Sequence, residues 1–162
     1  MRFTTALAAL ALAAPVAAPI AAHAAEPALE FAFEEIVTLD ADVPVGATSL
    51  GTRNIVPITG GTFEGPGIRG TIMGGGWDWQ LRRADGCTDV VADYFLKTDD
   101  GVIINVRNTG ALCPGQVVRT HPVFEAPLGK YDWLGKTTFV GTLEMADPKL
   151  GPAVKIRFYR VR

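Results

Sequence analysis

The stretch TDVVADYFLKTDDGVIINVRN, residues 88–108, contains two runs rich in β-branched and aromatic residues, joined by TDDG at residues 98–101. An Asp-Gly pair between two such runs is a strong signal for a β-hairpin. If the turn centres near residue 100, opposed residues have numbers that add to about 200. The hairpin is therefore predicted to pair Asp93 with Arg107.

The same register divides the hairpin into two faces. Alternate residues of a strand point to opposite sides of the sheet, so the even-numbered positions share one face. These are apolar or aromatic: Val90, Ala92, Tyr94, Leu96, Ile104 and Val106. The odd-numbered face carries Asp93 and Arg107. Two interpretations of this pair stay open: an acid and a base facing a cavity, or an exposed ion pair contributing less than about 1 kcal/mol.

The register also places Cys87 opposite Cys113, the only two cysteines of the chain. In an oxidising compartment such a pair is expected to form a disulfide. Free thiols and a metal site with His121 are the alternatives, but two Cys and one His are a small ligand set for zinc. We predict the disulfide, and we predict neither a metal site nor a cofactor.

The N-terminus indicates export. Residues 1–24 combine an early Arg2 with an alanine- and leucine-rich segment and end in Ala-His-Ala, the pattern of a secretory signal peptide with its cleavage site. An uncleaved membrane anchor is the alternative, but Pro15 and Pro19 interrupt the segment. We predict a periplasmic or secreted protein, not inserted in the membrane after cleavage, whose residues 25–162 form a single domain.

Charge and composition limit the classes of partner and of enzyme that we expect. Removing Arg2 leaves 15 − 1 = 14 basic and 17 acidic side chains, a net charge of −3. The basic residues are scattered rather than clustered, so nucleic acid is not an expected partner. Ser49 is the only serine and lies outside any nucleophile-elbow pattern, so a serine hydrolase is not expected either.

The rest of the chain has an all-β pattern. Runs rich in β-branched and aromatic residues recur between Gly, Pro, Asn and Asp, without a strong helix, as in an antiparallel sandwich or barrel. The predicted strands cover residues 29–39, 51–57, 62–63, 68–73, 77–83, 88–97, 102–108, 117–125, 136–144 and 154–161.

One segment contains a literal G-x-G-x-x-G at Gly65, Gly67 and Gly70. A dinucleotide-binding loop needs a helix directly after its glycines, because the helix N-terminus holds the phosphates. Here Pro66 stands inside the motif and a strand-like run follows. The glycines are better explained by tight bends and close strand approach in a curved sheet.

Aromatic clusters suggest where a site could lie. Trp77-Asp78-Trp79 follows a triple glycine, and Tyr131-Asp132-Trp133 precedes a late strand. Because Asp78 and the tryptophans point to opposite faces, another strand must complete any site. We expect the residues of a small-molecule site at a barrel rim to be Trp77, Asp78, Trp79, Tyr94, Arg107, Tyr131 and Trp133, with Asp78, His121 and Tyr94 as candidate catalytic groups. The alternative is that the tryptophans only fill the ends of the core.

Several blocks together resemble the bacterial and fungal family known as domain of unknown function 3237. They occur in this order: GGTFEGPGIRGTIMGGGWDWQ, RADG, YFLKTDDGVIINVRNTG, HPVFEAPLGKYDWLGKTTFVGT and IRFYRV. The resemblance covers residues 31–161 and implies a small antiparallel β-barrel, which we expect to have about 8 to 10 strands. It also implies that homo-oligomers would be unsurprising. The sequence departs from the family pattern at Trp77, Asp93 and the Cys-Pro-Gly at 113–115, a change expected to shorten or open the loop at the barrel mouth.

Three functions follow as hypotheses. The first is an exported barrel that binds a small apolar or aromatic molecule in its mouth. The second is a cofactor-independent isomerase, cyclase or lyase that uses acid-base chemistry in the same cavity. The third is a structural or protein-interaction barrel of the cell envelope. The sequence leaves open whether the protein is an enzyme.

Overall fold

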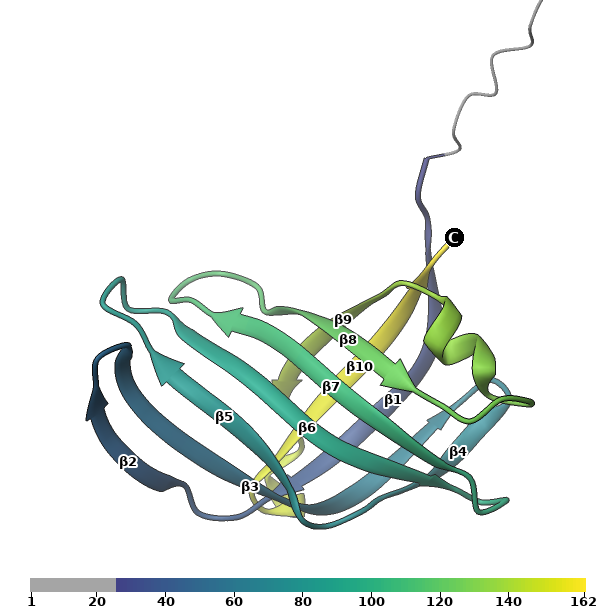
Figure 1. Ribbon diagram of the computed structural model, residues 1–162, viewed down its shortest axis with the longest axis horizontal. Coiled ribbons are helices and arrows are strands. Elements are labelled where there is room, and N and C mark those ends of the chain that lie inside the picture. Colours follow the sequence, from purple (N-terminus) through teal and green to yellow (C-terminus); the bar gives the residue numbers. More distant parts are fainter. Residues whose placement is uncertain (1–25) are drawn as a thin grey trace, which may run out of the picture.

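The computed structural model describes residues 26–162, so the predicted signal peptide lies outside the described residues (Figure 1). Residues 26–162 form ten strands and two short 3₁₀ helices. The strands are β1 (Leu29–Leu39), β2 (Val43–Thr48), β3 (Gly51–Gly65), β4 (Ile68–Ile72), β5 (Gly76–Arg82), β6 (Thr88–Thr98), β7 (Ile103–Leu112), β8 (Arg119–Glu125), β9 (Phe139–Met145) and β10 (Ala153–Val161). The 3₁₀ helices are η1 (Asp132–Lys136) and η2 (Pro148–Leu150).

The sheet closes on itself. Its strands pair antiparallel in the order β1-β10-β9-β8-β7-β6, and β4 and β5 both lie between β6 and β3. Pairing of β3 with β1, from Glu34 opposite Glu64 to Leu39 opposite Ile58, completes the ring. The result is a closed eight-stranded antiparallel barrel with two extra strands, which confirms the predicted all-β fold class.

The central hairpin has the predicted register. β6 and β7 pair from Thr88 opposite Leu112 to Lys97 opposite Ile103, so each pair of residue numbers adds to 200. At the turn, the Thr98 hydroxyl accepts a hydrogen bond from the Val102 N–H at 2.8 Å. Cys87 and Cys113, which lie just outside this ladder, form the predicted disulfide. The local sequence thus fixes both the hairpin and its cross-link.

Several strand boundaries differ from the predictions, and β7 continues to Leu112 instead of ending at residue 108. The strand β2 was not predicted, and residues 51–57 and 62–63 belong to one long strand, β3, which runs through two glycines. The predicted start of β9 at residue 136 is wrong because residues 132–136 form η1. A hydrogen bond from the Thr137 hydroxyl to the Trp133 carbonyl, 2.8 Å long, stabilises this turn.

The glycine motif lies in the β3–β4 hairpin. Gly65 pairs with Ile68 across a turn of Pro66 and Gly67, and Gly67 has a φ of 75°, which favours glycine. The segment that follows is β4 rather than a helix. The motif therefore serves strand reversal, and the helix that a nucleotide site requires does not follow it.

One half of the barrel interior is filled by aromatic rings. Phe33, Phe124 and Phe158 contact one another with ring centroids 5.1–5.6 Å apart. Phe63 and Phe139 complete the cluster by packing on Phe33 and Phe124. The helix η1 covers this end (Figure 1), and its buried Leu134 belongs to the same core. Burying each phenylalanine contributes about 2–3 kcal/mol, so this end of the barrel is a packed core.

Within the described range, no helix is long and apolar enough to cross a membrane.

Removing the disulfide tests how much it stabilises this fold. It closes a segment with a sequence separation of 26 residues. Replacing both cysteines by alanine should lower the free energy of unfolding by about 3–4 kcal/mol, because the unfolded chain gains conformational freedom. Urea unfolding measures the change. A reducing agent should lower the midpoint of the wild type and leave that of the double variant unchanged; equal midpoints for both proteins without reductant would contradict the prediction.

Candidate functional site

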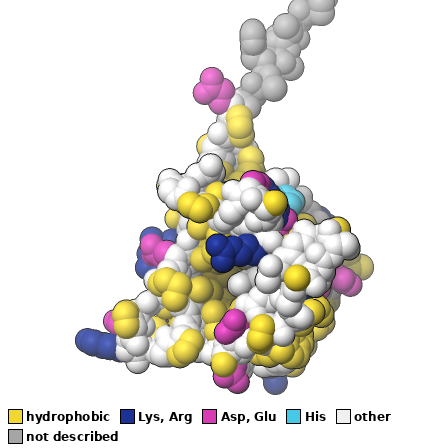
Figure 2. Space-filling view, turned by 90° about the vertical axis from the view of Figure 1, so that its left-hand side faces the viewer, with side chains coloured by type: hydrophobic (Ala, Val, Ile, Leu, Met, Phe, Trp, Pro, Cys, Tyr) yellow, Lys and Arg dark blue, Asp and Glu magenta, His cyan; other side chains and the backbone are white. Residues whose placement is uncertain are grey.

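The other half of the barrel interior is hollow. A cavity of about 220 Å³ lies between the sheet walls, on the side of the lumen away from η1. Figure 2 faces the end of the barrel that carries β2 and shows hydrophobic side chains gathered around a hollow, with a basic side chain beside it. Apolar side chains of β1, β3, β9 and β10 line most of the cavity, among them Leu39, Ile58, Leu143 and Ile156.

Polar side chains line the opposite wall. Asp78 and Gln80 project from β5, Asn108 from β7 and Thr120 from β8, and we call these four residues the polar arc. They are brought together by register. Asp78 pairs with Ala92, which pairs with Asn108, so these three side chains lie in one row across the sheet.

A second row lies one step closer to the mouth. Gln80 pairs with Val90, Val90 with Gly110, and Gly110 with Thr120. Ala92 in the first row has a small side chain, and Gly110 in the second row has none. The space between the polar groups therefore stays open. The four residues of the polar arc therefore lie along a concave part of the cavity wall.

Asp78 is the only acidic group of the polar arc. Its Oδ2 accepts a hydrogen bond from Gln80 Nε2 at 2.8 Å, while its Oδ1 is buried and has no hydrogen-bond partner within the described chain. Burial raises the pKa of Asp78 above its ordinary value, and the hydrogen bond from Gln80 opposes this only in part. Asp78 can consequently hold or release a proton inside an apolar cavity.

A second carboxyl group lies deeper. Glu35 is fully buried, and its Oε2 accepts a hydrogen bond of 2.5 Å from the Tyr94 hydroxyl. Because β1 and β6 are not neighbours in the sheet, this bond crosses the lumen. Val37 and Ala92 line the cavity, and Glu35 and Tyr94 are the next inward-facing residues on their strands. On each strand the pair therefore lies one inward-facing position beyond the residues that line the cavity.

Burial raises the pKa of Glu35 to about 8, and the hydrogen bond from Tyr94 lowers it only in part. Burial likewise raises the pKa of Tyr94, and the nearby Glu35 carboxyl adds to this effect. Both groups are thus neutral near pH 7, the state that their apolar surroundings favour. Glu35 Oε1 has no hydrogen-bond partner among the described residues.

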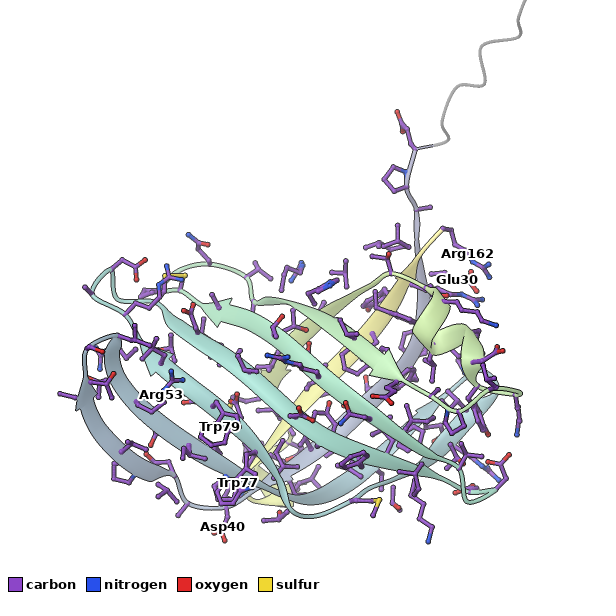
Figure 3. All side chains as sticks on the ribbon, in the orientation of Figure 1. Glu30, Asp40, Arg53, Trp77, Trp79 and Arg162 are labelled. Atoms are coloured by element: carbon purple, nitrogen blue, oxygen red, sulfur yellow. A yellow bond between two sulfur atoms is a disulfide. The ribbon has the colours of Figure 1, made fainter. Side chains whose placement is uncertain are left out.

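The predicted rim residues do not form one constellation. Trp77 and Trp79 lie on the outer face of β5, with exposed fractions of 42% and 44% (Figure 3). They point away from the lumen because they alternate with Asp78, which points into it. Of the predicted site residues, Asp78 lines the cavity, and Tyr94 is buried one inward-facing position beyond the lining residue Ala92.

Tyr131 and Trp133 lie at the other end of the barrel. The Tyr131 hydroxyl donates to Asp100 Oδ1 at 2.9 Å, which ties the start of η1 to the β6–β7 turn. Trp133 packs on Phe139, with ring centroids 5.9 Å apart. These contacts stabilise the fold. The cluster at residues 131–133 therefore has different surroundings from the cluster at residues 77–79, although the two look alike in the sequence.

Arg107 and His121 are exposed on the outer face, as odd-numbered positions of β7 and β8. Arg107 pairs with Asp93 as predicted. The Asp93 carboxylate accepts a hydrogen bond of 2.8 Å from Asn105 on the same outer face. Of the two interpretations of the Asp93–Arg107 pair, the one that placed it in a cavity is wrong, because this face of the hairpin is directed to the outside of the barrel. The predicted ion pair is not formed either: among the described residues, the Asp93 carboxylate bonds to Asn105.

Four polar residues in or next to the cavity were not among the predicted site residues: Glu35, Gln80, Asn108 and Thr120. Asn108 carried a usable signal, because it continues the even-numbered apolar face through Ile104 and Val106. A polar residue at such an inward position indicates either a partner or a site. Within residues 26–162, no group of three or more His, Cys, Asp or Glu side chains could hold a metal ion.

The fold and cavity define a small antiparallel β-barrel with an open, mainly apolar lumen. The family model described as "Protein of unknown function (DUF3237)" matches residues 27–118 and 114–161. The chain belongs to this family, as the sequence blocks suggested.

Relatives with similar chains support this assignment. A UPF0311 protein from Clostridium acetobutylicum is 29% identical over 154 residues, covering 82% of this chain and 95% of its own. The crystal structure of a β-barrel-like protein from Acinetobacter baumannii matches with a TM-score of 0.78 and 31% identity, covering 87% of this chain and 99% of that one. A protein from Penicillium herquei named a hydroalkoxylation enzyme is 32% identical over 114 residues, 70% of this chain and 72% of its own.

The buried carboxyl of Glu35 predicts an unusual pH dependence of stability. Its pKa rises from an ordinary 4.5 to about 8 on folding, so between these values the native state holds a proton that the unfolded state releases. The free energy of unfolding of the wild type should therefore fall as pH rises through this window, by up to about 1.4 kcal/mol per pH unit relative to Glu35→Gln. Urea unfolding between pH 5 and pH 8 measures the difference; parallel curves for the two proteins would contradict the prediction.

Proposed function

We propose that this barrel binds a small, mainly apolar molecule in its lumen. The observation that carries the proposal is the cavity itself, which combines an apolar wall with the polar arc on one side. Ligand sites of this kind use apolar surface for affinity and a few polar groups for orientation. At about 220 Å³ the cavity is smaller than most drug-sized pockets, which have volumes of roughly 300–1,000 Å³. The ligand is therefore small or extends out of the mouth.

The polar arc supports binding over a purely structural role. A barrel that served only as scaffold would gain stability by filling its lumen, as the aromatic half does. Instead this half of the lumen stays hollow, and the polar arc lines one side of it. A mainly apolar hollow with a few polar groups in its wall is typical of a small-molecule site.

We place this function in the periplasm or outside the cell. The signal-peptide pattern of residues 1–24 and the Cys87–Cys113 disulfide support this location, since disulfides persist in oxidising compartments.

Filling the lumen should abolish binding. Ala92→Leu adds an isopropyl group to the cavity wall, whereas Val91→Leu changes the neighbouring residue on the outer face and serves as the control. The neutral fluorophore N-phenyl-1-naphthylamine should bind the wild type and Val91→Leu saturably, and Ala92→Leu at least about tenfold more weakly, since overpacking costs about 1–3 kcal/mol. Fluorescence titration measures this, with melting curves to verify folding. Equal affinity of Ala92→Leu and wild type would place the fluorophore outside the lumen.

A second candidate function is cofactor-independent acid-base catalysis in the same lumen, as in an isomerase, cyclase or lyase. Asp78 favours it, because its carboxyl lines the cavity and burial raises its pKa, which is typical of groups that take part in acid-base chemistry. The name of the Penicillium herquei relative also supports it. Addition of a hydroxyl group to a carbon–carbon double bond forms one C–O bond and moves one proton from oxygen to carbon, so the reaction balances without a further reactant.

Substitution of Asp78 tests this candidate. The probe is 2-prenylphenol, whose cyclic ether product has the same mass and separates by chromatography. If Asp78 transfers the proton, Asp78→Asn should lower the rate by about 10²-fold or more. Asp93→Asn, which changes an aspartate on the outer face, should keep the wild-type rate. Cyclisation by Asp78→Asn at the wild-type rate would rule out this role for Asp78.

A further inference from the structure

Large apolar side chains lie exposed on the outer face of the strands β5 to β8. Trp77 and Trp79 of β5 point away from the lumen, with exposed fractions of 42% and 44% (Figure 3). Val123 of β8 is also exposed, at 56%. Apolar side chains that gather in one exposed patch mark a surface for interaction with another molecule. Whether these three gather depends on the register of the strands that carry them.

Strand pairing places two of them at the ends of one row. Trp77 pairs with Asp93, Asp93 with Arg107, and Arg107 with Val123, so the row crosses β5, β6, β7 and β8 in that order. Residues opposite each other on neighbouring strands have Cβ atoms roughly 5 Å apart, so the four side chains form a continuous strip. Trp79 lies beside the strip, two residues along β5. We call these five residues the tryptophan face.

The two charges in the middle of the tryptophan face do not pair with each other. Asp93 and Arg107 are exposed and directly opposite, yet neither takes part in an ion pair among the described residues. The Asp93 carboxylate accepts a hydrogen bond from Asn105 instead. The face therefore presents one acidic and one basic group to an external partner, and these charges sum to zero.

This order of residues makes the face self-complementary. Two such faces can pack against each other around a two-fold axis that runs parallel to the strands, between β6 and β7. The second copy then presents the strip in reversed order. Asp93 of one copy meets Arg107 of the other, and Trp77 meets the exposed Val123. Every contact away from the axis occurs twice.

The rows on either side fit the same axis. Val91 comes to lie opposite Thr109 of the second copy, and Phe95 opposite Asn105, because these residues pair across β6 and β7 within one chain. None of these four side chains is charged, so the neighbouring rows of the hairpin bring no like charges together.

We propose that two copies of this chain associate through the tryptophan face, with Asp93 of each copy paired with Arg107 of the other. Tryptophan and arginine are enriched in the central parts of protein interfaces, as on this face. Because the face carries one charge of each sign, a second copy complements it, whereas a uniformly acidic or basic partner would oppose one of the two charges. The interface is separate from the lumen, since no residue of the tryptophan face lines the cavity.

Reversal of the charges tests the arrangement. Asp93→Arg gives each copy two basic groups at the axis, and Arg107→Asp gives each copy two acidic groups. Either variant alone should dimerise at least about tenfold more weakly than the wild type, because like charges then meet twice. An equimolar mixture of the two variants should regain the wild-type affinity, since each opposed pair is again one acid and one base. Analytical ultracentrifugation over a dilution series measures the dimer fraction.

Removal of a tryptophan tests the apolar contact. Trp77→Ser should also weaken dimerisation by at least about tenfold, since a tryptophan in an interface contributes strongly to binding. Phe31→Ser is the matched control and should dimerise as the wild type does. Phe31 is an aromatic residue with an exposed fraction of 40%, but it lies on β1, across the lumen from β6. Melting curves verify that each variant is folded.

The outcomes are distinct. If the wild type and both charge variants dimerise equally well, the dimer uses another face and the proposal is wrong. If the two charge variants are monomers and their mixture is monomeric too, the two-fold arrangement is wrong. A wild type that stays monomeric throughout the dilution series overturns the proposal; a shift of its tryptophan fluorescence on addition of phosphatidylglycerol vesicles would then assign the face to a lipid surface.

Discussion

Closure of the sheet by pairing β3 with β1 is the constraint on which the rest of this structure depends. A closed barrel has no free edge along the ring, and it gives every strand an inner and an outer face. Alternate residues must then fit a lumen of fixed width. In this protein the lumen is divided: aromatic rings fill the half beneath η1, and small or polar side chains leave the other half open. The candidate site therefore exists because side chains fill one half of the lumen and leave the other half open.

The Glu35–Tyr94 bond marks the boundary between these halves. It joins strands that are not neighbours, so it links opposite walls through the interior. A buried carboxyl is costly as an ion, and the raised pKa of Glu35 shows how that cost is avoided at neutral pH. Because the folded state keeps Glu35 protonated, the free energy of unfolding depends on pH.

Prediction from sequence succeeded where the information is local. The Asp-Gly turn predicted the β6–β7 register, the register predicted the disulfide, and the glycine motif was correctly interpreted as a strand reversal. Prediction from sequence failed for most of the site residues, because the site is assembled from strands that are distant in sequence. Trp77 and Trp79 were predicted to belong to the site because they are large aromatic residues. They alternate with Asp78 and face outward. Asn108 carried a signal as a polar residue on an apolar face, but the sequence did not show that Thr120 and Asp78 lie on the neighbouring parts of the wall.

The sequence by itself determined the all-β class, the hairpin register, the cysteine pair and the family, since each depends on short-range patterns or on motifs carried in order along the chain. Only the tertiary structure decided which face of each strand points inward, which end of the barrel is packed and which is hollow, and which polar groups meet in the lumen. The physical reason is that alternation fixes which side chains share a face, whereas the direction of that face is set when the sheet closes.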